Sequence, residues 1–276
     1  MTKTIEKHLI AIDLDGTLLN DEKTISPLSK KVLKVLENHG HLIVISSGRA
    51  LRSVKFYANE VGLKNSPIVC YNGHLVTNLF DENFKSISYI LPENTVKQVY
   101  RELLDKNLII SAMSESTTDI YNDNDDGFLF AFYDKESMNI NEGPLDENIH
   151  EDVYTCVMKY DTTDPTKERD ILEVMKKYPD ISIRFWFGGD YCELYANDVS
   201  KSKAILDVAN FYNINKENII VFGDSDNDKE MLCDYNSYLM KNGNPTLKEF
   251  AKHITGYTNN DDGVARELIK YFDLKI

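Results

Sequence analysis

Two carboxylates lie two residues apart in the stretch Asp13-Leu14-Asp15-Gly16-Thr17. The apolar residues before them, 8–12, predict a buried strand, so both acids come at its carboxyl end. At such a position one carboxylate can attack phosphorus, while the other protonates the leaving alkoxide and later activates water. Gly16 permits the tight turn that brings the backbone close to a ligand. Asp13 and Asp15 are therefore a candidate catalytic pair for phosphoryl transfer; the alternative is an acidic turn without chemistry.

Three apolar runs predict the strands that must position such a site. Residues 8–12, 42–45 and 219–222 are short and uninterrupted, which is typical of strands buried on both faces of a parallel sheet. Each run ends in polar residues: Asp13, then Ser46-Ser47-Gly48, then Gly223-Asp224. Because open parallel sheets bind ligands outside the carboxyl ends of their strands, we expect these residues to converge.

Helices are predicted between and after these strands. The segment 27–39 has Ser26 as a candidate N-cap, Pro27 at the first helical position and Gly40 after its end. Further helices are predicted at 51–61, 201–212 and 264–272, and a hairpin at 67–77 that turns at Asn72-Gly73. These elements predict a Rossmann-like α/β core with a parallel sheet.

The middle of the chain has a different pattern. Strand-like segments at 86–91, 108–113, 153–160, 181–187 and 191–195 alternate with predicted helices at 93–105 and 166–178. We interpret this as an inserted α/β cap domain at residues 82–193. The core domain is then formed by residues 1–81 and 194–276.

The composition excludes several classes of protein. The formal net charge of −14 makes a general nucleic-acid or anionic-membrane surface unexpected. The four cysteines are far apart and none is in a CxxC pair, so neither zinc nor disulfides are expected. We find no apolar run long enough for a signal peptide or a membrane span, which predicts a cytoplasmic protein. The acidic composition also means that an anionic substrate would need a local cation.

Three further motifs follow the first in order along the chain: Ser46-Ser47-Gly48-Arg49, Asp198-Val199-Ser200-Lys201 and Gly223-Asp224-Ser225-Asp226-Asn227-Asp228. Together the four resemble the motifs of the haloacid dehalogenase (HAD) superfamily. Smaller segments are similar to signatures of its Cof-type sugar-phosphatase branch: Tyr71-Asn72-Gly73, Gly243-Asn244-Pro245 and Asp261-Asp262-Gly263-Val264-Ala265. The resemblance covers both halves of the predicted core, whereas the insert matches only in its position and its α/β alternation.

The resemblance implies a Mg²⁺-dependent phosphatase that acts on a small phosphorylated metabolite, a sugar phosphate as the first guess, through an aspartyl-phosphate. It implies that Asp13 is the nucleophile and Asp15 the general acid and base. Mg²⁺ would be held by the carboxylates of Asp13 and Asp224 and the backbone carbonyl of Asp15, which suits its preference for oxygen ligands. The remaining implied roles are the positive charge of Lys201, phosphoryl binding by Ser47, Gly48 and Asn227, and the ordering of bound waters or Lys201 by Asp228.

Two lysines are candidates for the residue that contacts the phosphate. Lys201 and Lys203 fall in the first turn of a helix with Ser200 as its N-cap, where the macrodipole disfavours cations. Because the helix itself disfavours them there, their placement indicates a role in the site. The alternative is that both are solvated surface lysines. The family pattern usually has Gly where this chain has Ser202, so the sequence leaves open which lysine reaches the phosphate; we favour Lys201.

Other patterns are weaker. Residues 224–228 and 122–126 have the spacing of a calcium-binding loop, but Tyr235 and Tyr133 occupy the twelfth positions, where such a loop needs Glu. The six histidines form no metal-like pair in the sequence and are predicted to be core or surface residues. The aromatic run 185–187 is either strand core or the wall of a pocket.

Two other functions remain open. A phosphomutase of the same superfamily would return the phosphoryl group to its product, but such enzymes usually carry their cap after the first motif. Here the insert follows the second motif. A non-catalytic phosphate-binding regulatory module would not need Asp13, Asp15, Lys201 and Asp224 together.

Overall fold

The computed structural model describes residues 6–124, 138–186 and 188–276. The chain forms two compact units: unit 1, Met1–Ile87 with Ser200–Ile276, and unit 2, Ser88–Val199. The predicted insert, 82–193, begins before the strand Ile87–Ser88 (β5), which still joins the sheet of unit 1. Its predicted end falls inside the strand Tyr191–Ala196 (β11) of unit 2. Pairing within each sheet therefore places both boundaries later than the sequence pattern did.

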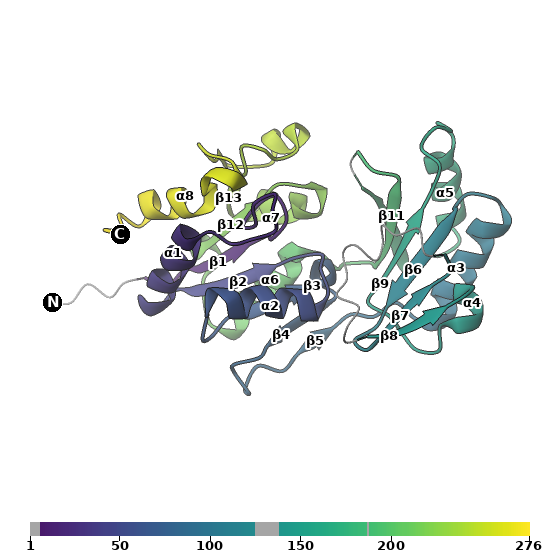
Figure 1. Cartoon of the computed structure of the whole chain (residues 1–276), viewed down its shortest axis with the longest axis horizontal. Helices are drawn as coiled ribbons and strands as arrows, with labels where there is room; N and C mark the ends of the chain where they lie inside the picture. Colours follow the sequence, from purple (N-terminus) through teal and green to yellow (C-terminus); the bar gives the residue numbers. More distant parts are fainter. Residues whose placement is uncertain (1–5, 125–137, 187) are drawn as a thin grey trace. The chain divides into compact units, whose positions relative to one another are not determined.

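Unit 1 is built on a sheet with the strand order β14-β13-β12-β1-β2-β3-β4-β5 (Figure 1). Its other strands are β1 (Leu9–Ile12), β2 (Leu42–Ser46), β3 (Pro67–Cys70), β4 (Leu75–Asn78), β12 (Ile219–Gly223), β13 (Asn236–Leu239) and β14 (His253–Ile254). The pairs from β14 to β3 are parallel, and β4 returns antiparallel to β3. The three predicted central strands and the hairpin are confirmed, and so is the predicted α/β class with a parallel-sheet core.

The order of these strands creates a switch point at the centre of the sheet. From β1 the chain moves outward to β2 and β3, and later returns on the other side of β1 to form β12 and β13. Because parallel crossovers are right-handed, the helices of the two halves cover opposite faces. Ligand sites of such sheets lie where the order reverses, outside the carboxyl ends of the strands. Asp13 and Asp224 follow the two strands that meet there.

The helices of unit 1 are α1 (Pro27–Asn38), α2 (Leu51–Val61), α6 (Lys201–Phe211), α7 (Lys229–Asp234) and α8 (Gly263–Tyr271). Ser26 caps α1 by accepting a hydrogen bond from the Ser29 amide at 3.0 Å, and Ser200 caps α6 by accepting from Lys203 at 3.2 Å. Side chains of α6, including Ala204, Ile205 and Val208, pack on one face of the sheet. The Ser200 cap fixes where α6 begins, and therefore where Lys201 lies.

Unit 2 is a sheet with helices packed on one face. Its strand order is β10-β11-β9-β6-β7-β8. Besides β11, its elements are α3 (Glu93–Asp105), β6 (Ser111–Glu115), β7 (Asp119–Asn122), β8 (Asn139–Glu142), α4 (Leu145–Asn148), β9 (Thr155–Lys159), α5 (Lys167–Met175) and β10 (Ile181–Phe185). Phe185 packs on the helix-side core, whereas Trp186 packs with a smaller cluster around Met113 and Tyr191. These contacts favour strand core for the first two residues of the aromatic run; residue 187 lies outside the described residues.

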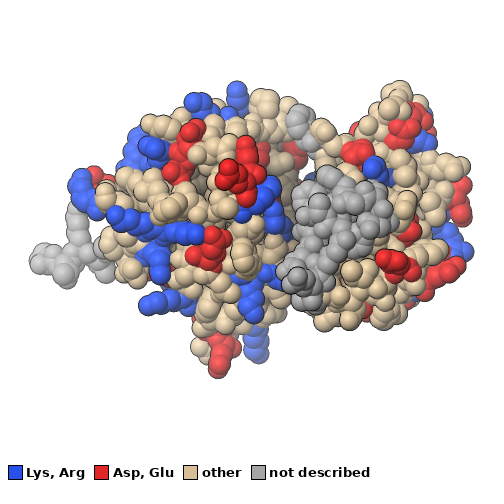
Figure 2. Space-filling view, in the orientation of Figure 1, with Lys and Arg blue, Asp and Glu red and all other residues tan. Residues whose placement is uncertain are grey.

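Charged side chains of both signs are mixed on the surface. On the face of unit 1 that Figure 2 shows, Lys and Arg side chains lie among Asp and Glu side chains. In the part of the chain that the structure describes, no helix is long and apolar enough to cross a membrane.

A buried imidazole lies at the amino end of the central strands. His41 is 5% exposed, its Nδ1 accepts a hydrogen bond from the His8 amide at 3.2 Å, and its ring lies 4.6 Å from that of Phe272. Burial, with the neighbouring charges of His8 and His39, lowers the pKa of His41 to about 4. The folded protein therefore holds this ring neutral at pH values where the unfolded chain protonates it.

We expect His41 to make the protein less stable in mild acid. Its stabilising contribution is present above pH 6.5, the ordinary pKa, and is lost as the pH falls towards 4. Each pH unit in that window costs about 1.4 kcal/mol, so the loss reaches up to about 3 kcal/mol. In urea unfolding between pH 7 and pH 4.5, His41→Asn, which keeps an acceptor for the His8 amide, should show a shallower decline than wild type. His253→Asn, at an exposed position that does not contribute to the His41 pKa, is the control, and parallel declines for all three proteins would contradict the assignment.

Candidate active site

The centre of the site is a buried lysine between two carboxylates. Lys201 Nζ lies 2.6 Å from Asp13 Oδ1 and 2.7 Å from Asp228 Oδ1, and all three side chains are almost fully buried. Burial alone would lower the pKa of Lys201, but the two carboxylates outweigh it and raise the pKa. The lysine is therefore a permanent positive charge next to Asp13.

A third carboxylate completes the group. One carboxylate oxygen each of Asp13, Asp224 and Asp228 lies within 4.8 Å of the other two. Burial raises the pKa of Asp13 well above its usual range, and burial together with Asp228 raises the pKa of Asp224 to about 7. Three carboxylates face one ammonium, which leaves a net charge of −2 when all are ionised. An oxygen-rich site with this charge fits a divalent cation such as Mg²⁺.

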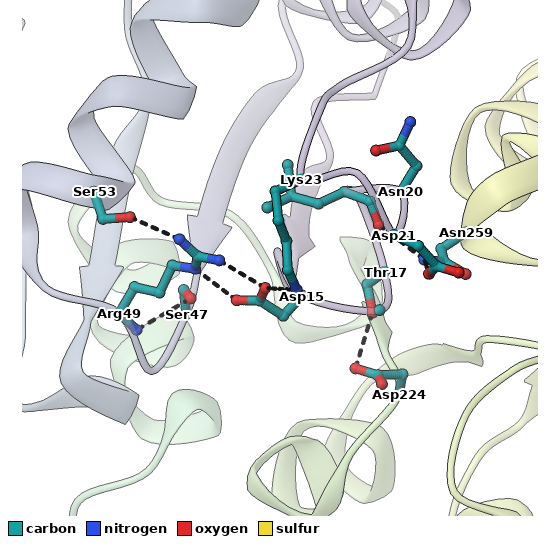
Figure 3. A network of polar contacts seen from close by, with 12 residues as sticks. Asp15, Thr17, Asn20, Asp21, Lys23, Ser47, Arg49, Ser53, Asp224 and Asn259 are labelled. Atoms are coloured by element: carbon teal, nitrogen blue, oxygen red, sulfur yellow. Dashed lines mark hydrogen bonds and ion pairs between the residues drawn. The ribbon is translucent and has the colours of Figure 1, made fainter. Parts of the chain in front are cut away.

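Gly16 and Thr17 bring the first acidic loop against Asp224. Gly16 has φ +73°, and a Cβ there would lie 2.4 Å from Asp224 Oδ2. Thr17 Oγ1 donates a hydrogen bond to Asp224 Oδ1 at 3.3 Å (Figure 3). Only glycine satisfies both the backbone conformation and the space, so the backbone after Asp15 can approach the carboxylates.

The side chain of Asp15 is held by two cations from the same unit. Arg49 donates through Nε to Asp15 Oδ2 at 2.6 Å and through NH2 to Oδ1 at 2.8 Å, and Lys23 Nζ lies 2.7 Å from Oδ1 (Figure 3). Arg49 is itself braced by Ser53 Oγ at 3.1 Å. Burial would raise the pKa of Asp15, but Arg49 and then Lys23 lower it to about 2. In this arrangement Asp15 is a carboxylate whose two oxygens are already engaged.

The residues implied for phosphoryl binding are linked through Asn72. Asn227 Nδ2 donates to Asn72 Oδ1 at 2.9 Å, and a Cβ on Gly48 would lie 3.0 Å from the same oxygen. The Asn72 amide in turn donates to the Ser47 carbonyl at 3.1 Å. Ser47 Oγ accepts from the Arg49 amide at 3.2 Å, which leaves its hydroxyl proton for a further acceptor.

The turn between β3 and β4 also positions Lys201. Tyr71, Asn72 and Gly73 all have positive φ, and Gly73 approaches the start of α6 so closely that a Cβ would lie 2.5 Å from the Ser200 carbonyl oxygen. The close approach explains why glycine follows Asn72. The same turn thus holds the segment implied for phosphoryl binding and the helix that carries Lys201.

The structure distinguishes Lys201 from Lys203 by direction and burial. Lys201 points at Asp13 and is buried, whereas Lys203 is only partly buried. Ser202 turns away from them, donating from Oγ to Asp234 Oδ2 at 2.5 Å. A serine in place of the usual glycine is therefore accommodated by α7 without displacing Lys201.

Asp228 supports both the lysine and the loop of Asp224. Its Oδ2 accepts hydrogen bonds from the amides of Asp224 at 2.8 Å and Ser225 at 3.2 Å, while Oδ1 faces Lys201. Both oxygens are thus in use, which suits the implied ordering role. Asp226 instead accepts from Asn244 Nδ2 at 3.0 Å. The second candidate loop, 122–126, lies partly outside the described residues.

The sequence reasoning gave no role to several residues that hold the site. Arg49 and Asn72 lie within the recognised motifs, so their positions in the sequence could have indicated a role in the site. Lys23 lies in no recognised motif, and no sequence signal points to it. It also did not foresee that folding brings His150 close to Asp119 and Glu151 in unit 2. There Asp119 already accepts hydrogen bonds from Thr118, Asn139 and Asn141, so we assign no metal to that group.

Comparisons with known proteins agree with this geometry. The family model of haloacid dehalogenase-like hydrolases matches residues 10–268. The 5-amino-6-(5-phospho-D-ribitylamino)uracil phosphatase YitU of Bacillus subtilis (strain 168) is 32% identical, over 97% of this chain and 98% of that protein. A second phosphatase of the same name and organism, YcsE, is 28% identical over 96% of this chain and 95% of its own.

A solved structure shows the same fold. The haloacid dehalogenase-like hydrolase from Bacteroides thetaiotaomicron superimposes with a TM-score of 0.81 and 25% identity, covering 97% of this chain and all of that one. The predicted family and enzyme class are therefore confirmed. The chain belongs to the haloacid dehalogenase-like hydrolase family and is a phosphatase of that family.

Proposed function

We propose that this phosphatase is Mg²⁺-dependent and hydrolyses a small phosphorylated metabolite through a phosphoryl group carried on Asp13. The observation that carries the proposal is the group of Asp13, Asp224 and Asp228, with oxygens within 4.8 Å of one another and a single lysine to balance them. The carboxylates of Asp13 and Asp224 and the Asp15 carbonyl would hold Mg²⁺. The bound ion would offset the negative charge of substrate and carboxylates.

Asp13 supplies the nucleophile in the first step. Its carboxylate oxygen forms a bond to phosphorus while the bond from phosphorus to the alkoxide of the substrate breaks. Lys201 stays charged throughout and stabilises the negative charge that Asp13 shares with the phosphoryl oxygens. Ser47, the Gly48 amide and Asn227 orient those oxygens. In the second step, water attacks phosphorus and returns the Asp13 carboxylate and inorganic phosphate.

Arg49 and Lys23 keep Asp15 ionised in the free protein. Asp15 is proposed to take up a proton when the bound substrate displaces these cations, to give that proton to the leaving alkoxide, and to take one from the attacking water in the second step. The structure imposes a condition on this role, because Arg49 and Lys23 now occupy both oxygens of Asp15. We propose that a leaving-group oxygen displaces Arg49 and Lys23 when the substrate binds. The leaving alkoxide of an alkyl phosphate would then receive its proton from Asp15.

The relatives suggest the substrate class. Both B. subtilis proteins are named for a substrate with a phosphorylated ribityl chain, which is an alkyl phosphate on a sugar alcohol. We propose the same compound as the first candidate for this chain, ahead of sugar phosphates, flavin mononucleotide, pyridoxal phosphate and nucleotides. Unit 2 would act as the cap that selects among them.

The test is the release of inorganic phosphate from this panel and from p-nitrophenyl phosphate. We expect chelation to abolish release and added Mg²⁺ to restore it. Ca²⁺ should restore it poorly, because its longer bonds and higher coordination number disturb the in-line geometry. Full activity after exhaustive chelation would contradict the metal assignment. Conversion of a sugar phosphate to its isomer without net phosphate release would indicate a mutase. The absence of any turnover would indicate a phosphate-binding module.

A further inference from the structure

The segment after β13 contacts both acidic loops of the site. Because β13 lies next to β12 in the sheet, the residues that follow it emerge beside the loop of Asp224. The Met240 amide donates to the Gly223 carbonyl at 2.9 Å, and the Gly243 amide donates back to Met240 at 2.8 Å. This turn carries Asn242, Gly243 and Asn244 past the carboxyl edge of the sheet.

Each of these three residues reaches one of the loops. Asn242 Nδ2 donates to the Gly16 carbonyl, in the loop after Asp13, at 2.7 Å. A Cβ on Gly243 would lie 2.9 Å from the Met240 carbonyl oxygen and 3.0 Å from the Asp224 carbonyl oxygen, so glycine favours the close approach. The Asn244 amide donates to that same oxygen at 2.7 Å, and its Nδ2 donates to Asp226.

A second layer holds the tripeptide from behind. The Asn259 amide donates to Asn242 Oδ1 at 2.9 Å, and Asn259 Nδ2 donates to the Leu19 carbonyl at 3.0 Å and to Asp21 Oδ1 at 3.2 Å. Figure 3 shows Asn259 beside Asp21 at the far end of the first loop. Asn259 and Asn244 are both 8% exposed, so their side-chain hydrogen bonds are shielded from water.

We propose that Asn242, Gly243 and Asn244 form a clamp that sets the separation of the two acidic loops and thereby the affinity of the site for Mg²⁺. None of the three is among the residues proposed to hold Mg²⁺ or the phosphoryl group, so they act as positioning residues. The inference rests on the proposed function, because it requires Asp13, the Asp15 carbonyl and Asp224 to share one ion. Like charges on the two loops repel each other, so without the clamp they should relax apart before an ion binds.

The variants Asn242→Ala, Gly243→Ala and Asn244→Ser separate the contacts. Asn242→Ala removes the hydrogen bond to Gly16 and the acceptor of the Asn259 amide, at an exposed position where the fold tolerates the change best. Gly243→Ala removes no side-chain hydrogen bond but crowds the turn, because the new Cβ would lie 2.9 Å from the Met240 carbonyl oxygen and 3.0 Å from that of Asp224. Asn244→Ser keeps an N-cap acceptor for the turn Pro245–Glu249 while losing the donor to Asp226.

The matched control is Asn218→Ala. Asn218 is also 8% exposed and also donates a side-chain hydrogen bond, to Glu6 at 2.8 Å, but it precedes β12 at the opposite edge of the sheet. It measures the cost of losing a buried asparagine from unit 1 without touching the acidic loops.

The experiment measures the Kd of Mg²⁺ for the full chain by calorimetry, with the melting temperature and p-nitrophenyl phosphate turnover alongside. We expect the clamp variants to bind Mg²⁺ about 10–100-fold more weakly, as for other groups that orient metal ligands. Most of kcat should return at saturating Mg²⁺. Asn218→Ala should lower the melting temperature without changing the Kd. If the clamp variants bind Mg²⁺ with the same Kd as Asn218→Ala, the clamp proposal is wrong and the proposed function is unaffected. If the wild-type protein binds no Mg²⁺, both the clamp proposal and the proposed Mg²⁺-dependent function are wrong.

Discussion

Asp13→Asn protein should release no measurable phosphate from any substrate. The amide has no anionic oxygen with which to attack phosphorus, and Asp13 is the acidic side chain that both contacts Lys201 and follows the central strand β1. Loss of an essential nucleophile typically costs on the order of 10⁵–10⁶-fold in kcat. The asparagine is isosteric and its Oδ1 can still accept from Lys201, so the fold should persist. Steady-state release from p-nitrophenyl phosphate, with circular dichroism of the same sample, checks both statements.

The control for Asp13→Asn is Asp273→Asn, which removes an exposed carboxylate near the end of the chain. It should retain wild-type turnover. Acid-quenched wild-type enzyme should also carry phosphate that is stable in acid and released by hydroxylamine, as expected of an acyl phosphate, whereas Asp13→Asn should carry none. Turnover by Asp13→Asn within tenfold of wild type would exclude Asp13 as the nucleophile.

The sequence could predict where the chemistry lies because buried parallel strands leave a clear pattern. β1, β2 and β12 are uninterrupted apolar runs, and a polar residue directly after such a run must lie at the carboxyl edge of the sheet. That argument, with the order of the motifs, was sufficient to bring Asp13 and Asp224 together. The sequence also predicted both ends of α3 correctly, because Glu93–Asp105 has a continuous helical periodicity.

The strands and α-helices that were missed are β7, β8, β13, β14, α4 and α7, each at most six residues long. β8, Asn139–Glu142, is polar and largely exposed, and it is held by parallel pairing with β7 and by side-chain hydrogen bonds to Asp119. β14 has two residues, and α4 has four. Short elements like these are stabilised by their neighbours in space, so neither propensity nor periodicity reveals them.

The partners of Asp15 could not be predicted for a different reason. The pairing of Asp15 with Arg49 joins two loops whose backbone conformations are set by Gly16, Asn72 and the clamp. A motif specifies which residue types are present, but the direction of each side chain depends on those conformations. For Lys201 the sequence could say more, because Ser200 fixes the start of the helix and limits the first turn to two candidates.

Lys201→Met protein should lose both activity and stability, and Lys203→Met should lose little of either. Lys201 is the buried cation between Asp13 and Asp228, so its removal leaves two buried carboxylates without compensation. Breaking a buried ion pair in this way typically costs about 3–5 kcal/mol. Lys203 is only partly buried, and its substitution should cost less than about 1 kcal/mol. Urea unfolding without Mg²⁺ at pH 8 measures both costs, and phosphate release at saturating Mg²⁺ should fall at least ~10²-fold for Lys201→Met alone.

The pH dependence of this difference separates lost charge from lost packing. Burial already raises the pKa of Asp13 above its usual range, and removing Lys201 takes away the charge that opposes this. A carboxyl whose folded pKa lies above its unfolded value destabilises the fold at high pH and ceases to do so as the pH falls through the folded pKa. The stability gap between wild type and Lys201→Met should therefore narrow from pH 8 to pH 5. A gap that is the same at both pH values would mean that Lys201 contributes packing rather than charge, and an equal loss in Lys203→Met would mean that the two lysines are not distinguished by the site.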